Sequence, residues 1–93
     1  MVEILQTKRP LRGGEMPGPF EVVLAEALFV STLQSSDSPS PDQVRRAIGT
    51  TLRRFGGPGC GAQVAREFGD HPDTAGARMK WALATIRSSP DAP

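Results

Sequence analysis

The sequence predicts an all-α fold, a small domain of four helices at about 18–34, 41–55, 60–69 and 72–88. Two observations carry this prediction. Apolar residues recur at the three- and four-residue spacing of helices through most of the chain. Clusters of proline, glycine and serine interrupt that spacing at the points where the helices would be joined. The 93 residues are the size of a single domain.

The first helix is expected around the apolar run from Phe20 to Leu33, FEVVLAEALFVSTL. One broad face of it comprises Phe20, Val23, Leu24, Ala27, Val30 and Leu33. Because Val22 and Phe29 fall outside this face, the helix is apolar on more than one side. Such a helix is either the buried centre of a bundle or one that also meets a partner chain. We expect a core helix, with a homodimer that uses Phe29 as the alternative.

The ends of the chain differ from its middle in composition. Residues 1–17 combine glycine and proline with Lys8, Arg9 and Arg12, which predicts a flexible basic N-terminal arm. Residues 18–89 are expected to form the single helical domain, and residues 90–93 a disordered tail.

The second helix has a clear start signal and two distinct faces. Ser40 is placed as N-cap, Pro41 at the first helical position and Gln43 three residues after the cap. Its apolar face comprises Val44, Ala47, Ile48, Thr51, Leu52 and Phe55. The opposite side carries Arg45, Arg46 and Arg53, with Arg54 at its edge, and Asp42 can pair with the first two. This positive patch is either a solvated face or a surface for phosphate groups or an acidic partner.

The C-terminal part of the chain predicts a helix-turn-helix. After the glycine-rich stretch 56–59, a short helix would place Val64 and Phe68 inward, with Ala65 small enough for a close crossing and Cys60 as a small buried residue. A second helix would begin after His71. Its inward residues are Ala75, Met79, Ala82, Leu83 and Ile86.

Residues 64–82 resemble the second half of the promoter-recognition domain at the C-terminus of bacterial sigma factors. The shared pattern is Val64-Ala65, Phe68-Gly69, His71-Pro72, Thr74-Ala75 and Arg78-Met79. Asp70 departs from it, since the family usually has an aliphatic residue there. The resemblance implies that helix 72–88 lies in the DNA major groove.

The outward side chains near the start of that helix are poorly suited to recognise DNA bases. They are His71, Asp73, Gly76, Ala77 and Lys80. Glycine and alanine offer no side-chain hydrogen bond, and a carboxylate repels phosphates. Trp81 lies to one side of the apolar stripe, and tryptophan is enriched at protein interfaces.

Two functions therefore remain open. The first is a small DNA-binding or transcription-associated protein that contacts double-stranded DNA. The residues expected to do so are Arg45, Arg46, Arg53, Arg54, Arg78 and Lys80. The second is a non-enzymatic interaction module, for a protein partner or a homodimer, that uses helix 20–33 with Phe29 and the surface around Trp81.

Composition sets limits on other functions. Eleven basic against ten acidic side chains give a net charge of +1, so overall charge does not indicate a partner. One cysteine and one histidine cannot form an intrachain disulfide or an ordinary zinc site. Without paired carboxylates or a Ser, His and Asp pattern, we expect no enzyme, cofactor or small-molecule substrate. We also expect no membrane span and a cytoplasmic location.

Overall fold

The computed structural model describes residues 18–88, and this range contains three α-helices, one short 3₁₀-helix and no strand. The elements are α2 (Pro19–Val30), η1 (Ser35–Asp37), α3 (Pro41–Asp70) and α4 (Pro72–Ser88). The all-α prediction is confirmed. The predicted basic arm 1–17 and tail 90–93 lie outside the described residues.

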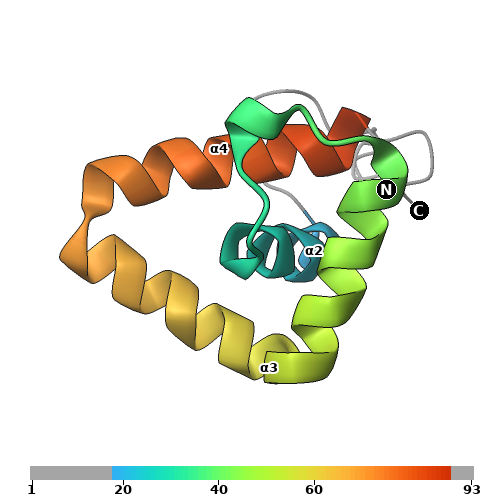
Figure 1. Ribbon diagram of the computed structural model, residues 1–93. Coiled ribbons are helices and arrows are strands. Elements are labelled where there is room, and N and C mark those ends of the chain that lie inside the picture. Colours follow the sequence, from blue (N-terminus) through green and yellow to red (C-terminus); the bar gives the residue numbers. More distant parts are fainter. Residues whose placement is uncertain (1–17, 89–93) are drawn as a thin grey trace, which may run out of the picture.

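Helix α2 lies inside a frame formed by α4 and the two halves of α3 (Figure 1). Its second half is buried on nearly every side, through Ala25, Ala27, Leu28 and Phe29. The predicted apolar face is wrong at its N-terminal end, where Phe20 is 57% and Val23 38% exposed. Whether a residue of α2 is buried therefore depends more on its position along the helix than on which face of the helix it occupies. The reason is that the neighbouring helices enclose mainly the C-terminal half of α2.

Helix α2 ends four residues before the predicted boundary. At Ser31 the chain becomes extended, with φ −64° and ψ 170°. The backbone N–H of Ser31 donates to the Ala27 carbonyl at 3.0 Å, and its hydroxyl donates to the Leu28 carbonyl at 2.6 Å. These bonds satisfy carbonyls that the end of a helix leaves without partners.

Helix α3 begins with the predicted capping box. The Ser40 hydroxyl accepts from the Gln43 backbone N–H at 3.1 Å, and the Gln43 side chain accepts from the Ser40 N–H at 2.8 Å. Of the predicted apolar face, Val44, Ile48 and Thr51 are buried. The prediction for Phe55 is wrong: its side chain is 37% exposed, because it lies where the helix bends.

The predicted second and third helices form one element with a sharp kink. Gly56 has φ 74° and ψ 165°, a backbone conformation that is open essentially to glycine alone. Pro58 follows, where its missing N–H is tolerated at the start of the second half of α3. The kink replaces the expected loop and lets α3 cover two sides of α2.

Small residues line the crossing of α2, α3 and α4. Ala27, Cys60 and Ala82 are completely buried, as expected for Cys60. A Cβ atom at Gly61 would lie 3.3 Å from a carboxylate oxygen of Glu26. The absence of larger side chains lets the helices approach closely.

The far end of the molecule, where α3 meets α4, is more open than predicted. A single residue turns the chain: the His71 N–H donates to the Glu67 carbonyl at 2.7 Å, and its carbonyl accepts from Ala75 N–H at 2.8 Å. Val64 is buried as predicted, but Ala65 is exposed and Phe68 is 39% exposed. These two predictions are wrong because α2 fills the space between α3 and α4 and ends before it reaches this corner (Figure 1).

Candidate anion-binding surface

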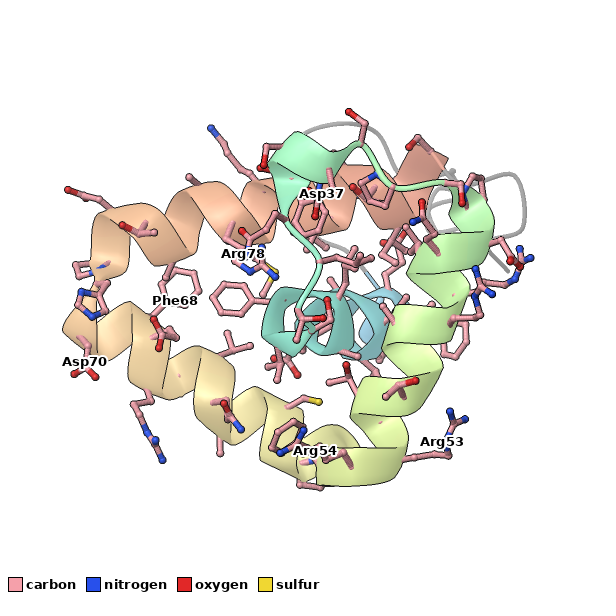
Figure 2. All side chains as sticks on the ribbon, viewed as in Figure 1. Asp37, Arg53, Arg54, Phe68, Asp70 and Arg78 are labelled. Atoms are coloured by element: carbon pink, nitrogen blue, oxygen red, sulfur yellow. The ribbon has the colours of Figure 1, made fainter. Side chains whose placement is uncertain are left out.

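Four arginines lie on the first half of α3: Arg45, Arg46, Arg53 and Arg54, here called the arginine surface. Figure 2 shows Arg53 pointing away from the molecule, Arg54 beside the bend of α3, and Asp70 at another corner of the molecule. All four are exposed. The periodicity of α3 places Arg45, Arg46 and Arg53 together, with Arg54 at the edge of the group, as the sequence predicts.

Asp42 interacts with the first two arginines. One of its oxygens lies 2.8 Å from Nη2 of Arg45, and the other lies 3.2 Å from Nη2 of Arg46. The side chains remain 51% and 72% exposed, respectively, and Asp42 is 60% exposed. Exposed pairs of this spacing contribute only about 0.3–0.5 kcal/mol, so a phosphate can compete with Asp42 for Arg46.

Arg53 and Arg54 have weaker partners. Nη2 of Arg53 donates to the Thr50 hydroxyl at 3.4 Å, and the Arg54 guanidinium lies 5.3 Å from the centroid of the Phe55 ring. Within residues 18–88, neither guanidinium forms an ion pair with a carboxylate. Their positive charge is therefore directed towards solvent.

Two open hollows accompany the arginine surface. The first, of about 250 Å³, lies between α3 and the segment that follows α2. Its polar lining comprises Ser31, Thr32, Arg46, Thr50, Thr51 and Arg54. The second, of about 320 Å³, is lined by Arg45, Arg46, Gly49, Thr50 and Arg53. Guanidinium groups bind phosphate oxygens through paired N–H donors, and threonine hydroxyls can add a further donor.

Arg78 occupies a different environment from the other arginines. Its Nε donates to the Phe29 carbonyl at 2.7 Å, and its Nη2 donates to the carbonyls of Ser31 at 3.0 Å and Leu33 at 2.8 Å. Burial lowers the pKa of this guanidinium. Because its donors are engaged by the end of α2, the structure removes Arg78 from the expected phosphate contacts.

Lys80 is exposed on α4 and lines neither hollow. The arrangement thus brings together four of the six predicted cationic residues and leaves Arg78 and Lys80 apart from them.

The predicted interface residues are largely covered. Phe29 is only 6% exposed and packs with Val64 and Ala75, so it cannot serve as a dimer contact in this fold. The second half of α3 covers Phe29. The sequence did not predict this burial, because Phe29 lies outside the main apolar face of its helix. Trp81 is half-buried, and the Arg78 guanidinium lies 5.0 Å from its ring.

The hydroxyl groups of the hollows were missed by sequence reasoning. Thr50 could have been found, since it lies four residues from both Arg46 and Arg54 and so shares their side of the helix. Ser31 and Thr32 could not, because they reach the arginine surface only through the folding of α2 against α3.

Comparison with protein-family models, with curated proteins and with solved structures found no match. Within the described range, no helix has the length and hydrophobicity required to cross a membrane.

Proposed function

We propose that this protein is a small DNA-binding protein associated with transcription, and that the arginine surface contacts the phosphate backbone of duplex DNA. The observation that carries the proposal is the placement of four exposed guanidinium groups beside two hollows on the first half of α3. Contacts of this kind give binding that is strong at low salt and indifferent to base sequence.

The role of α4 in this proposal is minor. Its exposed positions near the start include Asp73, Ala77 and Lys80, and Arg78 is turned inward. One lysine beside one carboxylate gives little attraction for phosphates and few donors for base edges. Contact between α3 and the DNA phosphate backbone is therefore better supported than recognition of base edges by α4.

The sigma-factor resemblance supplies the link to transcription. In its favour, Val64 on α3 and Ala75 on α4 pack together behind the junction of the two helices. The junction itself is one residue, His71, which is shorter than the turn of about three or four residues in helix-turn-helix motifs. Ala65, expected at the crossing, is exposed. The resemblance therefore supports the packing of these helices more than groove recognition.

The test is a titration of a labelled duplex, followed by fluorescence anisotropy at several salt concentrations. Log affinity should fall linearly with log salt, and the double variant Arg46→Glu/Arg54→Glu should lower the slope by about two. Arg66→Glu is the control for a single reversal and is compared with Arg46→Glu alone, since Arg66 is an exposed arginine on the second half of α3, outside both hollows. Absence of binding at low ionic strength would rule the proposal out.

A protein-interaction module is the second candidate, and the exposure of Phe20 and Val23 favours it. These two side chains make the first turns of α2 apolar towards solvent. If they form a dimer contact, light scattering after gel filtration should give twice the chain mass, and Phe20→Ser should return the monomer. A wild-type protein that stays monomeric at high concentration would exclude this dimer.

A further inference from the structure

The two hollows of the arginine surface share a common ridge. Arg46 and Thr50 line both, whereas Thr32 and Arg54 belong to the first only, and Gly49 to the second only. The ridge consists of side chains one helical turn apart. Anions held in the two hollows would therefore be immediate neighbours.

We infer that the hollows are two phosphate subsites, and that they take two neighbouring phosphates of one strand of duplex DNA. The inference rests on the proposed function and specifies how the arginine surface engages its ligand. Arg46 stands between the subsites and can donate to both phosphates, since a guanidinium presents five N–H donors in a planar fork.

The first subsite combines α3 with the segment after α2. Arg46 and Arg54 supply charge from one wall, and Thr32 lies on the other. That second wall follows the C-terminus of α2, where the helix dipole gives a negative partial charge that would repel a phosphate. Arg78 offsets it, because its guanidinium binds the carbonyls of Phe29, Ser31 and Leu33. Arg78 itself lines neither hollow and contacts no phosphate in this arrangement.

The second subsite is lined by Gly49. A Cβ atom at that position would lie in ordinary contact, 3.4 Å from Nη1 of Arg53. A side chain introduced at Gly49 would therefore lie beside this guanidinium. The Thr50 hydroxyl accepts from Nη2 of Arg53 at 3.4 Å, which helps to hold the group beside the hollow.

The hollows can be blocked one at a time. Thr32→Glu places a carboxylate in the first hollow, and Gly49→Glu places one in the second. Neither position is in the buried core, so both variants should fold, which circular dichroism checks. Ala62→Glu makes the same change of charge at an exposed site on the second half of α3, outside both hollows.

The 93-residue chain is titrated with a labelled duplex over a range of salt, as for the proposed function. Each blocking variant should lower the slope of log affinity against log salt by about one relative to Ala62→Glu, and the double variant by about two. A peptide with two adjacent phosphoserines should bind far more weakly than the duplex.

Other outcomes separate the two proposals. If wild type binds the duplex but either blocking variant matches Ala62→Glu, the two-subsite inference is wrong and the proposed function stands. If the duplex does not bind at low salt, both fall. Preference for the doubly phosphorylated peptide would also overturn both, in favour of a protein ligand.

Discussion

The guanidinium of Arg78 on α4 closes the C-terminal end of α2 at Phe29. Its Nε donates to the Phe29 carbonyl at 2.7 Å, while the same group lies 5.7 Å from the centroid of the Phe29 ring. The Arg78 guanidinium also lies 5.0 Å from the centroid of the Trp81 ring. One side chain thus provides hydrogen bonds, a charge for the helix dipole and contact with two aromatic rings.

Arg78→Met should destabilise the fold by about 2–3 kcal/mol, because several carbonyls at the end of α2 lose a charged donor at once. Arg78→Lys should recover only part of this loss, since an ammonium group lacks the planar fork that reaches separate carbonyls. Urea unfolding measures both. Lys80→Ala, a change at a nearby exposed residue, should alter stability by less than about 0.5 kcal/mol. Equal unfolding midpoints for Arg78→Met and wild type would contradict this role.

The two stacked phenylalanines should differ in their contributions to stability. Their ring centroids are 6.2 Å apart, but Phe29 is 6% exposed and Phe68 39%. Phe29→Ala should cost about 3–5 kcal/mol, as for a core aromatic residue. Phe68→Ala should cost only about 1–2 kcal/mol, because it loses the ring contact and a partly buried surface. The comparison is made by thermal and urea unfolding, and equal losses would show that Phe68 is core.

Local signals in the sequence predicted local structure well. The capping box of Ser40 and Gln43 is present, and the glycine-rich stretch coincides with the change of direction at Gly56. Arg45, Arg46, Arg53 and Arg54 share an exposed region because helical periodicity alone determines it. These features depend on a few neighbouring residues.

Features that depend on the packing of distant elements were not predicted. The apolar pattern of α2 could not reveal that its surroundings cover Phe29 and leave Phe20 in solvent. From the sequence, Arg78 was expected to be a surface cation. Its hydrogen bonds to backbone carbonyls form only because α2 lies beside α4. The first hollow likewise joins residues from the end of α2 to α3.

The kink in α3 should depend on Gly56. Its φ of 74° and ψ of 165° are strained for any residue with a Cβ atom, so Gly56→Ala should cost about 1–3 kcal/mol. Gly57→Ala is the matched control, because a Cβ atom there meets no other atom within 4 Å. That variant should be stabilised by about 0.4–1 kcal/mol through lower entropy of the unfolded chain. If urea unfolding gives both variants the same stability, the kink does not require the positive φ of Gly56.

Cys60 should make the stability of the protein sensitive to alkaline pH. It is completely buried, and desolvation, followed by the nearby charge of Glu26, raises the pKa of its thiol. In the unfolded chain the thiol ionises near pH 8.5, whereas the folded chain keeps its proton to higher pH. Below the unfolded-state value the thiol causes no loss of stability. Above it the free energy of unfolding should decrease, by up to about 1.4 kcal/mol per pH unit, until the folded-state pKa is passed.

Urea unfolding of wild type and Cys60→Ala between neutral and alkaline pH tests this coupling. The difference in stability between the two chains should shift in favour of Cys60→Ala as the pH rises, because only wild type must keep a proton on a buried sulfur. A disulfide reagent should react slowly with the folded chain and quickly in denaturant, since the thiolate is the reactive form. A difference in stability that does not vary with pH would mean that the surroundings of Cys60 do not oppose its ionisation.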